Sequence, residues 1–192
     1  MLKLGVLDQS PVPAGSSPGD ALRNTIDLAR LADRLGYERY WLAEHHASTA
    51  LAGSSPEILI GQVAARTSHI RVGSGGVMLS HYSPLKVVEN FRVLHALFPG
   101  RIDLGIGRAP GSDQLTAVAL RPDHHLSEHD DFPRQLSELV GFLDDRFEPR
   151  HPFAAIHPSP AAPGSCIGAI RTRSRPSTRR SPGNRQPRRT SW

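Results

Sequence analysis

The sequence predicts an α/β fold with a parallel β-sheet, on three observations from residues 1–148. Short apolar runs recur about every 30 to 36 residues, a helical pattern follows each run, and three of the helices open with Ser-Pro. Strands that alternate with helices are typical of right-handed βαβ crossovers. Such units build either an open doubly wound sheet or a (β/α)8 barrel. No Gly-x-Gly-x-x-Gly motif follows the first strand, which argues against a Rossmann dinucleotide site.

The predicted helices carry recognisable start signals, and the first also carries a stop signal. Serine is a good N-cap, and proline fits the first helical turn because its missing N–H would be unpaired there. Gly36 stands where a left-handed C-terminal stop is expected. The expected strands are residues 4–7, 40–43, 70–79 and 102–106, and the expected helices run from 18 to Gly36, 57–67, 85–97 and 131–143. A long loop is expected between the fourth strand and the fourth helix.

Composition divides the chain after residue 148. Residues 1–148 carry 14 basic and 18 acidic side chains, a formal charge of −4, whereas residues 149–192 carry nine arginines, eight prolines and no acidic residue. The net charge of +5 therefore belongs to the tail, and the whole chain is not read as a basic nucleic-acid binder. With few large apolar side chains, the tail is expected to be disordered. The predicted organisation is a folded unit at 1–148 and a disordered basic tail at 149–192.

Two further features of the composition concern the cellular environment. The single cysteine, Cys166, excludes an intrachain disulfide and fits a reducing compartment. The N-terminus lacks the long apolar core of a signal peptide, and no stretch approaches the 18 apolar residues of a membrane span. We therefore expect a cytoplasmic protein without a membrane partner.

The second strand ends in Glu44-His45-His46, the most informative motif of the chain. Ligands of parallel α/β proteins bind at the carboxyl end of the sheet, and histidines there offer proton transfer near neutral pH. Glu44 is expected to hold a histidine tautomer or to pair with an arginine. Adjacent side chains on a strand point to opposite faces, so no metal site is expected at the two histidines. A polar strand end that only hydrogen-bonds to its loop remains the alternative.

Three other places at strand ends are candidates for a site. Gly75 and Gly76 interrupt an apolar strand, which marks a bulge or a close approach of the backbone. Arg108 follows the fourth strand, where its forked donors suit an anionic partner or a surface ion pair. Asp8 and Gln9 end the first strand and are expected to line a substrate pocket.

With these motifs in order, the chain resembles the luciferase-like flavin monooxygenases, the superfamily of bacterial luciferase. The resemblance is carried by residues 4–11 (LGVLDQSP), 40–46 (YWLAEHH), 70–79 (IRVGSGGVML), 83–89 (SPLKVVE) and 100–111 (GRIDLGIGRAPG). Each segment alone is a weak signal, and their order and spacing make the match specific. The resemblance covers roughly residues 2–157, and the tail matches no known part of the family.

The resemblance implies the N-terminal half of a TIM (β/α)8 barrel with about four βα units. It implies a reduced flavin, usually FMN, that reacts with O2 to oxidise a small organic substrate, and a separate flavin reductase that supplies it. His45 matches the family's acid–base histidine. Gly75 and Gly76 match the place of a cis non-proline peptide beside the flavin ring, and Arg108 matches a residue that holds the flavin or its phosphate. Some relatives use a deazaflavin instead, so this cofactor stays open.

Four βα units are half of what a closed barrel needs. The strands at both ends of a half-barrel are exposed edges, which a second copy of the chain could pair with to form a homodimer. The Arg- and Pro-rich tail has the composition of the wrong reading frame of a GC-rich gene, and we take a truncated, out-of-frame chain as a hypothesis. The alternative function is a non-enzymatic binder that uses the tail on nucleic acid or another anionic surface. Because the tail has no interleaved aromatic residues, the nucleic-acid alternative is the weaker one.

Overall fold

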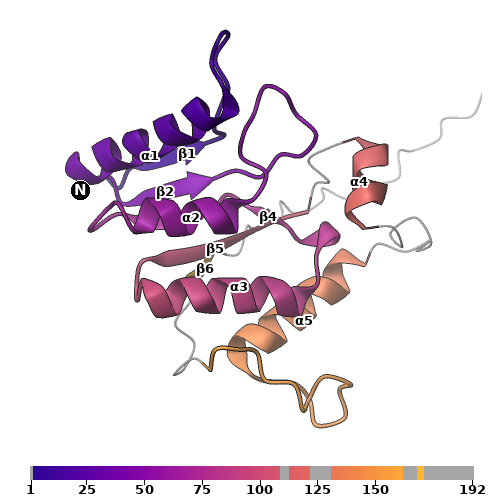
Figure 1. Cartoon of the computed structure of the whole chain (residues 1–192). Coiled ribbons are helices and arrows are strands. Elements are labelled where there is room, and N and C mark those ends of the chain that lie inside the picture. The colour runs from indigo at the N-terminus through magenta and orange to yellow at the C-terminus, as the bar shows by residue number, and fades with distance from the viewer. Residues whose placement is uncertain (1, 109–112, 122–130, 162–167, 171–192) are drawn as a thin grey trace, which may run out of the picture.

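The structure is a computed structural model that describes residues 2–108, 113–121, 131–161 and 168–170. The strands are β1 (Gly5–Asp8), β2 (Arg39–Leu42), β3 (Arg71–Ser74), β4 (Val77–Met78), β5 (Ile102–Gly107) and β6 (Gly168–Ile170). The helices are α1 (Pro18–Arg34), α2 (Pro56–Ala64), the 3-10 turn η1 (Leu79–His81), α3 (Pro84–Leu97), α4 (Gln114–Leu120) and α5 (Phe132–Asp144) (Figure 1).

All of the strand pairs are parallel, as the βαβ pattern predicts. The sheet order is β1-β2-β3-β5, and β4 continues along β5 beyond the point where β3 ends. The expected third strand is thus divided in two by Gly75 and Gly76. On its other side β5 pairs with β6. The described residues form the N-terminal part of a (β/α)8 barrel, with one βα unit for each of the four expected strands.

The three Ser-Pro pairs start helices where the sequence places them. Ser17 accepts from the Asp20 N–H in a complete capping box, and Ser55 and Ser83 are the N-caps of α2 and α3. Gly36 follows α1 with a φ of 76°, the left-handed conformation that glycine adopts without strain. These signals fix the length of each unit before any tertiary contact forms.

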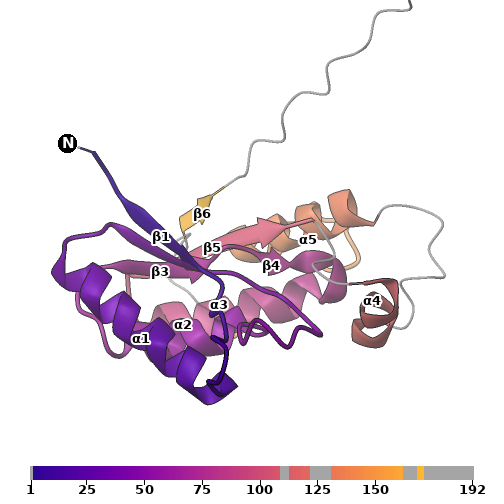
Figure 2. The same cartoon turned by 90° about the horizontal axis from the view of Figure 1, so that it is seen from above.

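The helices cover one face of the sheet, and the core lies between the two layers. Helices α1, α2 and α3 lie side by side beneath the strands, and α5 packs on α3 (Figure 2). The core side chains include Tyr40 and Leu42 of β2, Val72 of β3 and Ile102 of β5, each less than 1% exposed. No helix among the described residues covers the opposite face, on which the Leu7 side chain is 59% exposed.

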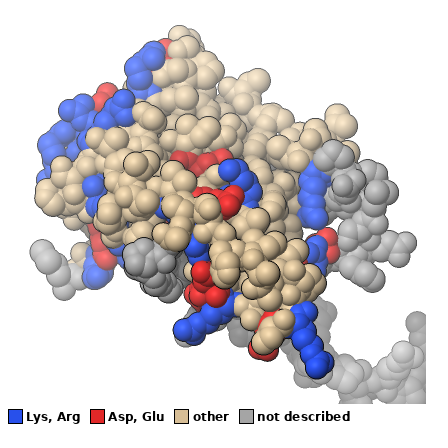
Figure 3. Space-filling view, turned by 60° about the horizontal axis from the view of Figure 1, so that its bottom comes forward, with Lys and Arg blue, Asp and Glu red and all other residues tan. Residues whose placement is uncertain are grey.

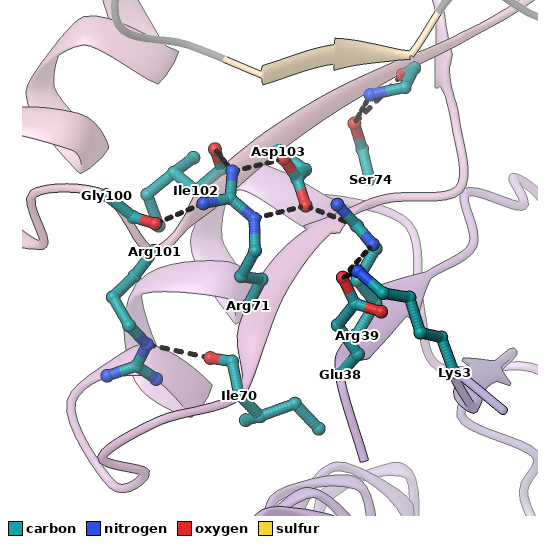
Figure 4. Close-up of polar contacts among 11 residues, drawn as sticks. Lys3, Glu38, Arg39, Ile70, Arg71, Ser74, Gly100, Arg101, Ile102 and Asp103 are labelled. Carbon is teal, nitrogen blue, oxygen red and sulfur yellow. Dashed lines mark hydrogen bonds and ion pairs between the residues drawn. The ribbon is translucent and has the colours of Figure 1, made fainter. Parts of the chain in front are cut away.

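That uncovered face carries an ion-pair network near the amino ends of the strands. Asp103 of β5 is 2% exposed and pairs with Arg39 of β2 and Arg71 of β3 (Figure 4). Arg39 also pairs with Glu38, which holds Lys3. The network lies at the amino ends of the strands. In (β/α)8 barrels, residues at this end usually contribute to stability, and catalytic residues lie at the carboxyl ends.

Two features differ from the sequence-based expectations. The predicted long loop after β5 contains the short helix α4, capped by Asp113. Residues 149–161, expected to be disordered, form turns that pack on α5: the rings of Phe142 and Phe153 stack 5.7 Å apart, and Arg92 donates to the carbonyl of Pro158. Aromatic residues at 147, 151 and 153 supply the apolar contact that composition alone did not reveal. The rest of the predicted tail, apart from β6, lies outside the described residues.

Charged side chains are interspersed by sign over most of the face seen in Figure 3. This agrees with the composition of residues 1–148, in which acidic and basic side chains nearly balance. The excess of basic over acidic side chains in the whole chain comes from the arginines of residues 149–192.

Candidate functional site

The predicted site residues lie at the carboxyl edge of the sheet. The side chain of one of them, Asp8, turns toward the helices. The Gly75 N–H donates to the Leu42 carbonyl at 2.7 Å, so the glycine pair lies beside the end of β2. His45 comes three residues after Leu42, and Arg108 directly follows β5. The structure therefore gathers His45, Gly75, Gly76 and Arg108 at the ends of adjacent strands.

The Gly75–Gly76 peptide is cis, as the resemblance implied. A Cβ on Gly76 would lie 2.8 Å from the backbone of Gly105, so only glycine lets this segment approach β5 so closely. A Cβ on Gly75 would meet the side chains of Leu7 and Trp41 at 2.9 and 3.0 Å. The glycine pair thus borders an apolar surface that Leu7 and Trp41 form on the uncovered face of the sheet.

Glu44 is the centre of a buried hydrogen-bond network. Its side chain is 1% exposed, and its Oε1 accepts from His46 Nε2 and from the Tyr82 hydroxyl, each at 2.7 Å. Its Oε2 accepts the Met78 N–H at 3.0 Å. Of the two expectations for Glu44, the structure shows the first: it orients a histidine, and that histidine is His46.

The titratable groups around Glu44 respond to its charge and to burial. Burial first, and then the hydrogen bond to Glu44, raise the pKa of the Tyr82 hydroxyl well above its ordinary value, so Tyr82 acts as a donor. Burial also raises the pKa of Glu57 on α2, with a further contribution from the charge of Glu44. Glu44 thus accepts three hydrogen bonds, and its charge also contributes to the raised pKa of Glu57.

The two histidines of the motif differ in their surroundings. His46 binds Glu44 and stands edge-on to the ring of His81, with 6.1 Å between ring centroids. His45 donates its backbone N–H to the Gly53 carbonyl at 2.9 Å. Its Nδ1 is buried, and the described part of the chain offers it no hydrogen-bond partner. Of the two histidines of the motif, His45 is thus the one with a buried ring nitrogen that no described residue satisfies, a property shared by the Nδ1 of His95 on α3.

Arginine side chains gather near the start of α5. The Arg108 guanidinium lies over the Phe132 ring, 5.9 Å from its centroid. Asp131, the residue before Phe132, accepts from Arg121 at 3.5 Å and from Arg134 at 3.2 Å. Arg121 and Arg134 also line a cavity of about 300 Å³ at the start of α3. Three guanidinium groups therefore come from different elements to one end of the sheet.

The two candidates for the substrate pocket are placed differently. Asp8 Oδ1 accepts the Ser10 N–H at 2.7 Å, and Oδ2 accepts the Tyr40 hydroxyl at 2.6 Å. The same hydroxyl donates to the Thr25 carbonyl of α1, so Asp8 lies on the helix side of the sheet and ties β1 to β2 and α1. Gln9 is exposed at the end of β1. The structure keeps Asp8 apart from the surface of Leu7 and Trp41.

Sequence reasoning missed Tyr82, Trp41, Arg121 and Arg134. A signal existed for Tyr82, because it immediately precedes the Ser83-Pro84 helix start and so must lie at the carboxyl end of the sheet. No such signal pairs it with Glu44, which is 38 residues away. Within the described ranges, no three His, Cys, Asp or Glu side chains are grouped as metal ligands would be.

The family model described as luciferase-like monooxygenase matches residues 2–178, which extends past residue 157 where the motif resemblance ends. The chain belongs to this family.

Among its relatives, the chain is 52% identical to YwcH of Bacillus subtilis over 160 residues, 83% of the chain and 48% of the relative. It is 50% identical over 159 residues to a luciferase-like monooxygenase of Escherichia coli K12, covering 83% and 46%. It is 48% identical over 160 residues to N-acetyl-S-alkylcysteine monooxygenase of Bacillus subtilis, again covering 83% and 48%. The chain spans about half the length of these curated relatives.

Solved structures show a similar arrangement of strands and helices. Apo-MsnO8 superposes with a TM-score of 0.78 at 51% identity over 88% of this chain and 49% of that chain. The oxygenating constituent of 3,6-diketocamphane monooxygenase of Pseudomonas putida, solved in complex with FMN, gives 0.66 at 20% over 77% and 41%. An F420-dependent secondary alcohol dehydrogenase gives 0.54 at 17% over 78% and 45%. At these two lower identities the likeness concerns the fold.

None of the helices that the structure describes is both long and apolar enough to cross a membrane.

Proposed function

We propose that this chain carries the flavin-side part of a flavin-dependent monooxygenase site. The substrates are reduced FMN, O2 and a small organic molecule, and a flavin reductase supplies the reduced flavin. One oxygen atom of O2 enters the organic substrate, the other leaves as water, and the flavin leaves oxidised. The observation that carries the proposal is the placement of His45, Gly75–Gly76 and Arg108 together at the carboxyl edge of a luciferase-like sheet.

The residues present fit a flavin in shape and in polarity. Leu7 and Trp41 offer an open apolar surface for a planar ring, and the Gly75–Gly76 peptide borders it without side chains. Arg108 at the end of β5 suits an anionic phosphate, whereas Arg121 and Arg134 already pair with Asp131. When bound, reduced flavin would supply the two electrons that oxygen activation needs.

The roles proposed for side chains follow from their surroundings. His45 is the acid–base residue, because its buried Nδ1 has no partner among the described residues and an imidazole exchanges protons near neutral pH. Gln9, exposed at the end of β1, is the proposed contact to the organic substrate. Asp8 is left out of our assignment because its two oxygens accept from the Ser10 N–H and from the Tyr40 hydroxyl.

Anaerobic titration of the purified chain with reduced FMN tests this proposal directly. We expect saturable binding that Arg108→Ala weakens about tenfold or more, as loss of a charge-assisted contact should. His45→Asn should leave binding nearly intact and abolish substrate oxidation in a reaction supplied with a flavin reductase, O2 and a thioether or ketone panel. Arg30→Ala, which removes an exposed cation of α1 far from this edge, is the matched control. Absence of saturable binding by the chain would refute the proposal.

A deazaflavin is the second candidate, because F420-dependent enzymes share this fold. Parallel titration with reduced F420 distinguishes the two cofactors by affinity. The non-enzymatic alternative predicts instead that nucleic-acid binding is lost when residues 158–192 are deleted, whereas flavin binding should survive that deletion. Although β6 covers the outer side of β5, a homodimer formed through the edge strands of the described sheet is proposed as the form in which the chain turns over, and light scattering during the titration would detect it.

A further inference from the structure

Glu44 is placed to do more than orient one histidine. Its three hydrogen-bond donors come from two parts of the chain: His46 lies in the loop after β2, and Met78 and Tyr82 lie in the segment that runs from β4 to the start of α3. The carboxylate is 1% exposed, so each of these bonds is formed in a site from which water is largely excluded. Donors buried in this way are costly to leave without their acceptor.

The donor on β4 connects Glu44 to the rest of the candidate site. Met78 is two residues after Gly76, so its N–H holds the strand that leaves the glycine pair. Met78 also pairs with Gly107 of β5, the residue before Arg108. His45 is the residue that directly follows Glu44 in the chain. Glu44 is therefore connected to all three parts of the candidate site. It is the neighbour of His45 in the chain, and through Met78 it is linked to the glycine pair and to the residue before Arg108.

We infer that Glu44 is a positioning residue of the flavin site, whose carboxylate fixes the β4 backbone, His46 and Tyr82 so that His45, Gly75–Gly76 and Arg108 keep their relative places. The inference rests on the proposed function. Glu44 makes no contact with flavin or substrate in this role. It acts on the glycine segment through the Met78 N–H, and on His45 through the peptide bond that joins the two residues.

The variant Glu44→Gln tests the role with little change of shape. The amide supplies one acceptor oxygen and one NH2 donor, so it cannot accept from Met78, His46 and Tyr82 together. We expect the amide resonances of Gly75, Gly76, Met78 and Gly107 to shift, and the Met78 amide to exchange with solvent about tenfold faster. Affinity for reduced FMN should fall about tenfold.

Asp33→Asn is the matched control, because Asp33 is also a shielded carboxylate with three donors. It accepts the N–H groups of Ser68, His69 and Ile70 at the amino end of β3, far from the glycine pair. This variant should lose stability yet leave the four amide resonances and the FMN affinity as in the parent chain. Tyr82→Phe, which removes one donor and keeps the carboxylate, should give the same changes as Glu44→Gln at smaller size and guards against misfolding of the latter.

The two hypotheses fail in different ways. If both Glu44→Gln and Tyr82→Phe fold and leave the four amides and the FMN affinity unchanged, Glu44 is not a positioning residue, whatever the chain binds. If the parent chain binds no flavin, the proposed function fails, and the amide measurements on the protein without flavin still decide whether Glu44 orders the segment. Equal effects of Asp33→Asn on the four amides would also overturn the inference.

Discussion

The Nε of Arg71 on β3 lies 3.0 Å from Oδ2 of Asp103 on β5, so two neighbouring strands are joined by a charged pair as well as by their backbone ladder. Arg39 of β2 reaches the same oxygen at 3.1 Å. Since Asp103 is 2% exposed, three consecutive strands of the sheet depend on one shielded carboxylate at their amino ends (Figure 4).

Removing that carboxylate should be costly. We expect Asp103→Asn to lower the free energy of unfolding by about 3 kcal/mol, because two arginines lose the charge that compensates them. Urea unfolding followed by circular dichroism measures the change. Asp27→Asn breaks only an exposed pair with Arg30 and should cost less than about 1 kcal/mol. Equal losses in the two variants would contradict a special role for Asp103.

Asp33 should make stability depend on pH in the acid range. Burial alone would raise the pKa of this carboxyl, but the N–H groups of Ser68, Ile70 and His69 outweigh it and hold the pKa below the ordinary value of 3.8. A depressed folded-state pKa adds stability above 3.8, and this stability is lost as the pH falls through the lower folded value. The difference in unfolding free energy between the parent chain and Asp33→Asn should therefore be constant near neutral pH and shrink in acid. A difference that grows in acid would show the opposite sign.

Arg92 should decide whether the segment after α5 stays in place. Its guanidinium is 4% exposed and donates to the carbonyls of Phe142 and Pro158, each at 2.9 Å. Arg92→Met keeps much of the side chain's apolar bulk and leaves both carbonyls without this donor, so we expect a loss of about 2 kcal/mol and faster proteolysis after residue 148. Limited proteolysis with mass spectrometry locates the cleavage. Cleavage at the parent rate would show that the aromatic contacts of Phe153 suffice.

Gly76 should tolerate no side chain. A Cβ there would lie 2.8 Å from the backbone of Gly105, which has no flexible end to move. We expect Gly76→Ala to cost about 1 to 3 kcal/mol and to weaken flavin binding. The control Gly61→Ala, within α2, places its Cβ 3.4 Å from the flexible end of Leu94 and should be neutral or gain up to about 1 kcal/mol from helix propensity. Thermal unfolding and FMN titration report both effects, and a stable Gly76→Ala chain that binds normally would exclude the close approach as a requirement.

The hypothesis of an out-of-frame tail predicts a specific property of the coding DNA. Read in one of the other two frames, the codons around residues 148–192 should give a further strand followed by a helix, as the relatives continue well beyond the matched residues. Sequencing of the gene settles the matter. A stop codon early in both frames would reject the hypothesis.

Local signals in the sequence were sufficient for the four βα units. Ser17 caps α1 with its side chain as expected, whereas Ser55 and Ser83 occupy the N-cap positions of α2 and α3 without a side-chain hydrogen bond to the helix. Helix α4 was missed although Asp113 accepts the Thr116 N–H, since it has only seven residues and none of them is buried. Strand β6 has three residues and follows a segment of mixed composition, so nothing local marks it.

The sequence was sufficient to predict where the candidate site lies on the sheet. It was not sufficient to predict which side chains of the site contact one another. The ends of strands place His45, Gly75, Gly76 and Arg108, because all parallel strands end at one edge. Two partners of Glu44 are 34 and 38 residues away and are brought back to it by helix α2 and the strands that follow, which no local pattern encodes. Asp8 illustrates the converse: it stands at the right end of its strand, and the alternation of side chains turns it toward Tyr40 and α1.

The sheet register also bears on how the chain assembles during synthesis. Partners in successive strand pairs are separated by 34 residues for Gly5 and Arg39, 32 for Arg39 and Arg71, and 30 for Val72 and Ile102. Each new strand therefore meets its neighbour after one helix has emerged from the ribosome, and no step waits for the distant end of the chain. Asp103 and Gly168 are 65 residues apart, so β6 joins last, onto a surface that the first four units have already built.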